Sequence, residues 1–495
     1  MTAKLLIRSI TMNTKTLRQK ILDLAIHGKL VAQDPDDEPA SELLKRIKAE
    51  KEQQIKEGKI KKSKKTKTTS VPFEIPSSWE WTTLGEISNY GCCENIPVAE
   101  IGENDWVLEL EDIEKDTARI AQIRLKQDRD IKGVRHKFTN GDVLYSKLRT
   151  YLNKVLVAPH NGYCTTEIVP LHSYCNVSTY YLSHVLRSGY FLDYTQQCGY
   201  GVKMPRLSTN DACNGCIPLP PLTEQQRIVA EIERWFALID QIEQSKAALQ
   251  ATIAQAKKKI LDLAIHGKLV AQDPDDEPAS ELLKRIKAEK EQHIKEGKIK
   301  KSKKTKTTSD TPKSENPPFE IPSSWEWTTL GEIGVWQAGG TPNRMNMAYY
   351  GGTIPWLKTG DLNDGLITDI PEFITEEAVA NSSAKLNPAG SVLIAMYGAT
   401  IGKLGILSYP ATTNQACCAC IEYGVVEQLF LFYFLLSQRT AFIEKGGGGA
   451  QPNISKEIIV HTSFPLPPLA EQKRIVKKIE ELFGVLDTIQ QALGE

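Results

Sequence analysis

The chain carries one long segment twice, and this duplication limits its possible folds more than any other feature. Residues 21–70 and 260–309 differ at one position, where Gln54 stands against His293, and PFEIPSSWEWTTLGEI follows both copies. A looser repeat pairs PLPPLTEQQRIVAEIERWFALIDQI, from Pro218, with PLPPLAEQKRIVKKIEELFGVLDTI near the C-terminus. Because 495 residues exceed one ordinary hydrophobic core, the repeats predict two similar domains. They also indicate a surface that is used twice, although recent gene duplication alone would leave the same identity.

The order of the repeats indicates a circular organisation. The repeat from Pro218 runs directly into 260–309, whereas its second copy ends with the chain. That second copy followed by residues 1–30 would reproduce residues 218–270, so the sequence reads as a ring opened between Glu495 and Met1. We therefore predict that the two termini lie close together.

Residues 218–270 carry the pattern of one long coiled-coil helix. Thr223 and Gln226 form a capping-box pattern, and Gly267 provides a C-terminal stop. Apolar residues between them alternate at spacings of four and three, broken by Lys246. At 1.5 Å per residue, a helix from Thr223 to about His266 would be roughly 65 Å long. The C-terminal copy and the N-terminus continue the register, which predicts an antiparallel pair of helices; a bundle core inside one compact protein remains the alternative.

Two variable segments lie between the helices, and each is about the size of one α/β domain. GDVLYSKLRTYLNKV from Gly141 parallels GSVLIAMYGATIGKL from Gly390, and Asp112 falls opposite Asp361. The predicted fold class is α/β (α+β), with two globular target-binding domains separated by long antiparallel coiled-coil helices in a pseudo-two-fold circular organisation. The predicted limits are 1–71 for an N-terminal helix and Lys-rich linker, 72–217 for the first domain, 218–317 for the central helical region and linker, 318–464 for the second domain, and 465–495 for the C-terminal helix.

Composition and targeting patterns predict a cytoplasmic protein. Hydrophobic residues make up 41% of the chain, but no apolar run approaches the roughly 18 residues of a membrane span, and the N-terminus lacks the pattern of an export signal. In that compartment the ten cysteines are expected to be reduced thiols, and neither Cys213–Cys216 nor the group at 417–420 has the usual spacing of a zinc site. The formal net charge of zero means that any contact with nucleic acid must be concentrated in patches.

Motifs of catalysis and cofactor binding are incomplete. GATIGKLG at Gly398 has the wrong glycine spacing for a nucleotide-binding loop, and KGGGGAQPNIS at Lys445 does not complete a dinucleotide fingerprint. Asn316-Pro-Pro-Phe319 resembles the tetrapeptide with which adenine methyltransferases hold a flipped base, but it follows a polar linker and no glycine-rich cofactor loop accompanies it. We therefore predict no catalytic residue, no metal ligand and no cofactor in this chain.

Basic, amide and tyrosine side chains suited to DNA gather in both variable segments. Amides and guanidinium groups can read base edges in pairs of hydrogen bonds, while lysines mostly contact phosphates. The predicted DNA-binding residues are Lys147, Arg149, Tyr151, Lys154, Lys203 and Arg206 in the first segment, and Lys358, Thr359, Tyr397, Thr400, Lys403, Asn414, Gln415, Gln451 and Asn453 in the second. The lysine-rich tracts Lys56–Lys67 and Lys295–Lys306 fit either solvated linkers or sequence-independent phosphate contacts.

Nearly the whole chain resembles the specificity subunits of Type I restriction-modification systems. The resemblance is carried by KILDLAIHGKLVAQDPDDEPASELLKRI, PFEIPSSWEW, LYSKLRTYLNKV, IPWLKTGDLNDG, MYGATIGKLGIL, QPNISKEII and both PLPPL helix starts. The first domain lacks the YGAT and QPNIS signatures of the second and has KLRTYL and Met204-Pro-Arg-Leu207 instead. The two halves of the DNA site are therefore expected to differ in sequence.

The resemblance implies a noncatalytic subunit with two target recognition domains, each reading one half of a split double-stranded DNA sequence. It further implies that the helices set the gap and dock two modification subunits, which carry S-adenosylmethionine and methylate adenine. Restriction subunits using ATP and Mg²⁺ would join to translocate and cut DNA. Two other readings are weighed against it: a noncatalytic protein scaffold or adaptor with a coiled-coil spacer, and a standalone adenine methyltransferase that uses the Asn316 motif.

Overall fold

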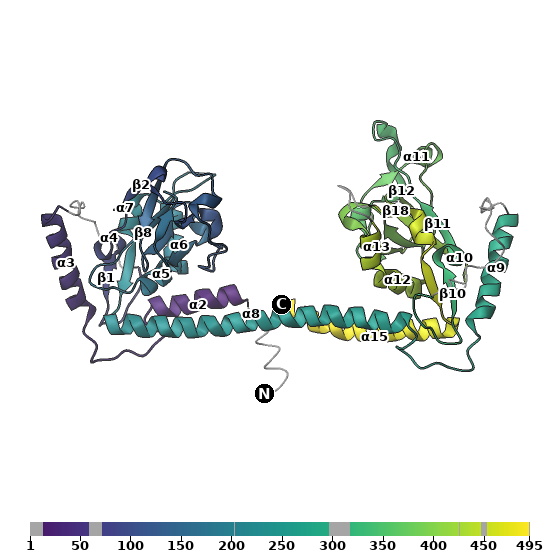
Figure 1. Ribbon diagram of the computed structural model, residues 1–495, viewed down its shortest axis with the longest axis horizontal. Helices are drawn as coiled ribbons and strands as arrows, with labels where there is room; N and C mark the ends of the chain where they lie inside the picture. Colours follow the sequence, from purple (N-terminus) through teal and green to yellow (C-terminus); the bar gives the residue numbers. More distant parts are fainter. Residues whose placement is uncertain are drawn as a thin grey trace. The chain divides into compact units, whose positions relative to one another are not determined.

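The computed structural model describes residues 13–58, 72–201, 203–296, 317–424, 426–446 and 453–494 (Figure 1). The chain divides into two compact units, and the division falls between Ala247 and Ala248. The predicted proximity of the termini, most of both lysine-rich tracts, Asn316 and Gln451 lie outside the described residues. The finer domain limits inferred from the sequence stay a prediction.

The first unit is built on two small sheets. One has the strand order β2 (Asn95–Pro97), β4 (Val134–Phe138), β7 (Gly162–Cys164), β3 (Val107–Leu108), and the other has the order β6 (Val155–Val157), β5 (Val143–Ser146), β8 (Ile168–Leu171). β3 runs parallel to β7, whereas the other neighbours are antiparallel. The helices and 3-10 turns of this unit are α2 (Thr14–Ile26), α3 (Ala40–Lys56), α4 (Leu84–Ile87), η1 (Val98–Glu100), η2 (Leu110–Asp112), η3 (Lys126–Asp128), η4 (Thr150–Leu152), α5 (Thr179–Arg187), α6 (Gly189–Cys198) and α7 (Thr209–Asn214).

The second unit is also built on two sheets, and one of them is larger than those of the first unit. A five-stranded sheet has the order β11 (Gly334–Ala338), β18 (Cys417–Glu422), β15 (Val392–Ala395), β16 (Leu404–Leu407), β13 (Gly365–Ile367), and a three-stranded sheet has the order β14 (Phe373–Ile374), β12 (Tyr350–Leu357), β17 (Thr412–Thr413). Its helices and 3-10 turns are α9 (Ala279–Lys295), α10 (Leu330–Ile333), η5 (Met347–Tyr349), η6 (Thr359–Asp361), α11 (Glu376–Ala380), η7 (Gly398–Thr400), α12 (Gln428–Ser437), α13 (Arg439–Lys445), α14 (Lys456–Val460) and α15 (Leu469–Gly494).

Each unit closes on a pair of strands from the two ends of its variable segment. In the first unit β1 (Glu80–Thr83) lies antiparallel to β9 (Cys216–Leu219), with Glu80 opposite Leu219. In the second unit β10 (Glu326–Thr329) pairs in the same way with β19 (Ser463–Leu466). The chain therefore leaves each fold beside the point where it enters.

The predicted long helix is confirmed as α8 (Leu222–Ile265), which has 44 residues. In the first unit α2 lies along it, and Arg18 of α2 donates to Asp240 at 2.7 Å. In the second unit α15 lies along it in the antiparallel direction, with Lys257 ion-paired to Asp487. The expected fold class, mixed helix and sheet with long helices between two globular parts, is confirmed, but part of the predicted apolar seam, including Ile242, is exposed.

The duplicated sequence folds into the same corner in both units. In the first, the indole Nε1 of Trp79 donates to Glu224 Oε2 at 2.9 Å, and Gln33 Nε2 donates to Glu224 Oε1 at 2.6 Å. Trp325, Gln272 and Glu471 make the same two hydrogen bonds at the same lengths in the second. These bonds tie the start of α8 or α15 to the segment that precedes each variable fold.

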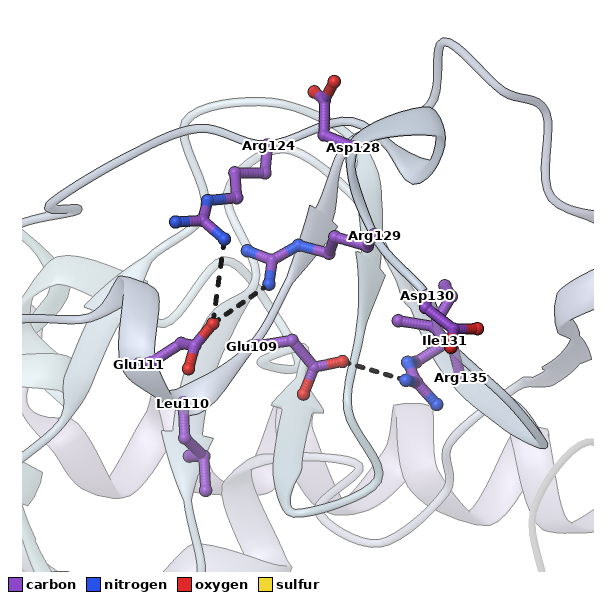
Figure 2. Close-up of a pocket in the computed structure, with 9 residues that line it drawn as sticks. All are labelled: Glu109, Leu110, Glu111, Arg124, Asp128, Arg129, Asp130, Ile131 and Arg135. Carbon is purple, nitrogen blue, oxygen red and sulfur yellow. Dashed lines mark hydrogen bonds and ion pairs between the residues drawn. The ribbon is translucent and has the colours of Figure 1, made fainter.

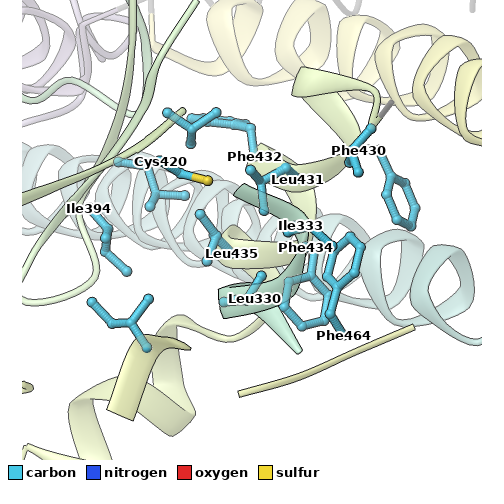
Figure 3. Close-up of a cluster of buried hydrophobic side chains, with 14 of the residues drawn as sticks. Leu330, Ile333, Ile394, Cys420, Phe430, Leu431, Phe432, Phe434, Leu435 and Phe464 are labelled. Atoms are coloured by element: carbon cyan, nitrogen blue, oxygen red, sulfur yellow. The ribbon is translucent and has the colours of Figure 1, made fainter. Parts of the chain in front are cut away.

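Alternate residues of the central strands supply two apolar clusters in each unit. In β15, Val392 and Ile394 pack toward α12, whereas Leu393 and Ala395 pack on the opposite face, as the two-residue period of a strand requires. The sequence of α12, QLFLFYFLLS, is apolar on most sides, and Figure 3 shows its phenylalanines among the buried side chains of this core. The three cysteines of β18, Cys417, Cys418 and Cys420, are free and buried in these clusters.

Candidate nucleic-acid interface

The predicted DNA-binding residues of the first unit lie on two loops that main-chain hydrogen bonds hold together. Residues 147–154 follow β5, and residues 199–201 and 203–207 follow α6. The amide of Arg149 donates to the carbonyl of Pro205 at 2.7 Å, and the amide of Leu207 donates to the carbonyl of Lys147 at 2.9 Å. Two stretches that are about fifty positions apart in sequence therefore form one surface.

The corresponding loops of the second unit meet in the same way. The amide of Ile454 donates to the carbonyl of Met396 at 2.9 Å, and the amide of Met396 donates to the carbonyl of Ala416 at 2.8 Å. Tyr397 and Asn453 form an isolated β-bridge. These contacts bring together the loops at 397–403, 414–416 and 453, which carry most of the residues predicted for this unit.

One more loop completes each surface and is called the third loop below. It follows β3 in the first unit, at residues 109–112, and β12 in the second, at residues 358–361. In the first unit Asp112 Oδ2 accepts the amide of Glu109 at 2.8 Å, and in the second Asp361 Oδ2 accepts the amide of Lys358 at 2.8 Å. The predicted alignment of Asp112 with Asp361 therefore agrees with the structure. The two units share one scaffold of loops and differ in the side chains that the loops present.

Several of the predicted cations are bonded within their own unit. Lys154 Nζ donates to the carbonyl of Leu110 at 2.7 Å, and Lys403 Nζ donates to the carbonyl of Leu362 at 3.3 Å. Lys154 therefore ties the third loop of the first unit to the loop at 147–154. Lys403 ties Leu362, which directly follows the third loop of the second unit, to the loop at 397–403. Arg206 is ion-paired with Glu167 at 3.0 Å, and Lys358 is ion-paired with Glu372.

The remaining predicted residues differ in how far they face solvent. Tyr151, Lys203, Tyr397, Gln415 and Asn453 are exposed. Lys147, Arg149, Thr359, Thr400 and Asn414 are half-buried, and Gln451 lies outside the described residues. Contact of each of these side chains with DNA stays a prediction.

A pocket beside the third loop of the first unit contains charged residues that the sequence reasoning missed. Its volume is about 600 Å³, and Figure 2 shows Arg124 and Arg129 directed toward the carboxylate of Glu111. Arg129 is ion-paired with the fully buried Asp112, and its Nη1 lies 3.4 Å from Glu111 Oε1. The pocket is lined by Glu109, Leu110, Glu111, Arg124, Asp128, Arg129, Asp130, Ile131 and Arg135.

The second unit has a smaller pocket beside its third loop. It has a volume of about 440 Å³ and includes Arg344, Tyr350, Glu372 and Phe373. The guanidinium of Arg344 lies 4.9 Å from the ring centre of Tyr350 and 3.4 Å from Glu372. Glu372, which lines this pocket, is ion-paired with Lys358 of the third loop. No sequence pattern identified either pocket, because the charged partners come from separate loops without a regular spacing.

The charges of these loops alter one another's pKa values. The hydrogen bond from Lys358 is the main cause that lowers the pKa of Glu372, with a further contribution from Arg344. Burial lowers the pKa of Lys154, and the nearby carboxylates of Asp112 and Glu111 oppose that shift. The carboxylate of Glu372 is therefore held in its ionised form beside two cations.

Two absences apply to the described residues alone. Within residues 13–494, apart from the undescribed gaps, no group of three or more His, Cys, Asp or Glu side chains could hold a metal ion. None of the helices that the structure describes is long and apolar enough to cross a membrane.

Comparisons with known proteins identify the family. Residues 322–494 match the family described as Type I restriction modification DNA specificity domain. The Type I restriction enzyme EcoAI specificity subunit of Escherichia coli is 32% identical, and the match covers 96% of this chain and 90% of that protein. The chain belongs to the Type I restriction enzyme specificity subunits. The EcoEI specificity subunit of E. coli is 30% identical over 97% of this chain and 90% of its own length.

A solved structure agrees with this specificity-subunit fold. It comes from work on complex assembly and conformational transition of the type I R-M system, and it has a TM-score of 0.59 at 22% identity over 86% of this chain and 94% of that one. A specificity subunit is a noncatalytic DNA-recognition subunit that acts in a complex with DNA and other restriction-modification subunits. The relatives do not favour the scaffold or standalone methyltransferase readings.

Proposed function

We propose that this specificity subunit reads a bipartite double-stranded DNA sequence, with one half read by each unit. The observation that supports it is the shared loop scaffold, in which the same main-chain hydrogen bonds hold different side chains. The matching positions Glu109 and Lys358, for example, carry opposite charges beside the same capping aspartate. A DNA site with two different halves requires two units of the same fold that present different side chains to the bases.

The duplicated corners would dock two modification subunits, each a methyltransferase. α3 and α9 have the same sequence except for Gln54 and His293, and both direct ion pairs to solvent, such as Lys45 with Glu42 and Lys284 with Glu281. A surface that occurs once in each unit supports two copies of one partner. Restriction and translocase subunits would join this assembly.

The cofactors of the assembly would then belong to those partners. S-adenosylmethionine would be bound by the modification subunits, and ATP with Mg²⁺ would be bound by the restriction subunits. The DNA substrate supports a cytoplasmic location for the whole complex.

The test is to express this chain with its modification subunit and to map the methylated adenines in host DNA. Exchange of residues 318–464 for those of a relative should change one half of the methylated motif and leave the other half unchanged. Methylation without a split motif, or a motif that does not depend on this chain, would contradict the proposal and favour a scaffold.

A second test addresses the spacing of the halves. Deletion of one heptad from the exposed middle of α8 should shorten or abolish the preferred gap while both half-site sequences are retained. A change in half-site bases with an unchanged gap would contradict the assignment of α8 as the spacer.

A further inference from the structure

A pair of opposite charges spans the same two backbone segments in both units, but with its polarity reversed. In the first unit the amide of Val107 donates to the carbonyl of Arg124 at 3.1 Å, and in the second the amide of Trp356 donates to the carbonyl of Glu372 at 2.8 Å. These hydrogen bonds identify Arg124 and Glu372 as structural counterparts. This segment carries a cation, Arg124, in the first unit and a carboxylate, Glu372, in the second.

The third loop carries the partner of opposite sign in each unit. Arg124 Nη1 lies 4.0 Å from Glu111 Oε1, whereas Glu372 is bonded to Lys358. Glu111 and Lys358 both belong to the turn that the aspartate caps, with Lys358 at the position that matches Glu109, and with Glu111 two residues further along its turn. The aspartate that caps the turn is the same in both units, whereas the charged side chain that the turn presents differs in sign. This arrangement is expected when the aspartate fixes the geometry of the turn and the charged side chain determines specificity.

The pair in the first unit is open to a ligand, and it stands on a rigid base. The side chain of Glu111 is 68% exposed and that of Arg124 is 40% exposed, while Arg129 beneath them is 6% exposed and Asp112 is fully buried. Arg129 Nε is buried and has no hydrogen-bond partner among the residues that the structure describes. The 4.0 Å separation leaves the guanidinium of Arg124 only loosely held by Glu111, although it also donates to Gln122 at 2.9 Å.

The position of this pair is continuous with the predicted DNA surface. Lys154 of the first loop donates to the carbonyl of Leu110, the residue next to Glu111. The amide of Asp116, a few residues further along, donates to the carbonyl of Leu152 in the first loop at 3.2 Å. The turn that carries Glu111 therefore adjoins the loop that carries Lys147, Arg149 and Tyr151.

We propose that Glu111 and Arg124 are specificity-determining residues that together read one G·C base pair in the half-site of the first unit. In the major groove guanine presents two acceptors, O6 and N7, which suit a guanidinium, and its partner cytosine presents the N4 amino donor, which suits a carboxylate. The two chemistries lie side by side on one base pair. The net acidic lining of the pocket disfavours the alternative ligand, a backbone phosphate, because four carboxylates there exceed three guanidinium groups.

The reversed pair of the second unit, Lys358 and Glu372, reads a base pair in the same manner. Its cation is on the third loop, so the guanine is expected on the opposite strand relative to the protein scaffold. This inference rests on the proposed reading of one half-site by each unit.

The decisive experiment is a charge swap in the intact complex with the modification subunit. The double variant Glu111→Arg/Arg124→Glu keeps both charges but exchanges their places, so one base pair of the methylated half-site should change from G·C to C·G. The single variant Glu111→Gln, at a mainly exposed position, should relax that position, with a loss of discrimination of about 10- to 100-fold. The matched control is Glu94→Lys/Lys137→Glu, which swaps an exposed ion pair of the same unit and should leave the motif unchanged.

The outcomes separate this inference from the proposed function. A motif that stays unchanged in both the swapped and the Glu111→Gln complexes overturns the reading role, while the exchange of residues 318–464 still tests whether each unit reads one half. Equal loss of methylation at every site, with the modification subunit still bound, also overturns it, because the pair would then maintain structure. A change confined to one base pair of one half supports it, and failure of the swapped protein to fold leaves the decision to Glu111→Gln.

Discussion

Removal of the capping aspartate should affect the first unit far more than the second. Asp112 is fully buried and accepts hydrogen bonds from the amide of Glu109 and from Gln122, in addition to its ion pair with Arg129. In Asp112→Ala, Arg129 would stay buried without its main counter-ion, and breaking a buried ion pair costs about 3–5 kcal/mol. Since Glu111 lies 3.4 Å from Arg129, we expect the lower end, about 3 kcal/mol.

Asp361→Ala is the matched control, because Asp361 is half-exposed and accepts the amide of Lys358 as its hydrogen bond within the described part of the chain. Loss of a cap of this kind costs about 1 kcal/mol. For units of this size the expected decreases in Tm are roughly 6–12 °C for Asp112→Ala and 2–4 °C for Asp361→Ala. Hydrogen exchange of the full chain in urea, followed at β5 and at β15, would report each unit separately. An Asp112→Ala cost no larger than that of Asp361→Ala would refute the importance of the buried ion pair.

Three further predictions concern the framework. Gly28→Ala and Gly267→Ala should each destabilise their unit by about 1–3 kcal/mol, because φ is +66° and +67° and an added Cβ would lie 2.4 Å from a proline ring. Thermal unfolding of the two variants measures this, and unequal losses of stability would contradict the equivalence of the two corners. Burial, with a contribution from a neighbouring arginine, lowers the pKa of His184 to about 3, so the first unit should lose stability as pH falls from 6.5 toward 3; denaturation across that range should show no such loss in His184→Phe. Burial raises the pKa of Glu224 and of Glu471 despite their hydrogen bonds. The wild type should therefore lose stability relative to Glu224→Gln and Glu471→Gln as pH rises above 4.5. Urea titrations at several pH values test this, and the same dependence of unfolding free energy on pH in wild type and variants would contradict it.

The sequence predicted the large-scale organisation well because that organisation is repeated and periodic. The heptad spacing placed the long helix between Thr223 and His266, and α8 runs from Leu222 to Ile265. The weak alignment of Asp112 with Asp361 was sufficient to match the third loops of the two units. Both signals depend on local or regularly spaced residues.

The charged pockets could not be predicted, because their contacts depend on tertiary structure. Arg129 meets Asp112 from 17 positions away, and Arg344 meets Glu372 from 28 positions away, with no regular spacing in either case. Lys154 was predicted as a DNA-binding residue from its type and neighbours, and the structure shows its ammonium bonded to a main-chain carbonyl. Residue type alone does not distinguish a lysine that is available to a ligand from one that secures a loop.

The strand pairs that close each unit have a consequence for how new specificities arise. Because Glu80 lies opposite Leu219, and Glu326 lies opposite Leu466, everything between the paired strands begins and ends at one place. A genetic crossover within PFEIPSSWEW and another within PLPPL would replace one complete fold and leave the flanking helices in register. The duplicated sequences would themselves offer the homologous DNA for such crossovers. Recombination, in addition to point mutation, could therefore supply this chain with a new target in a single step.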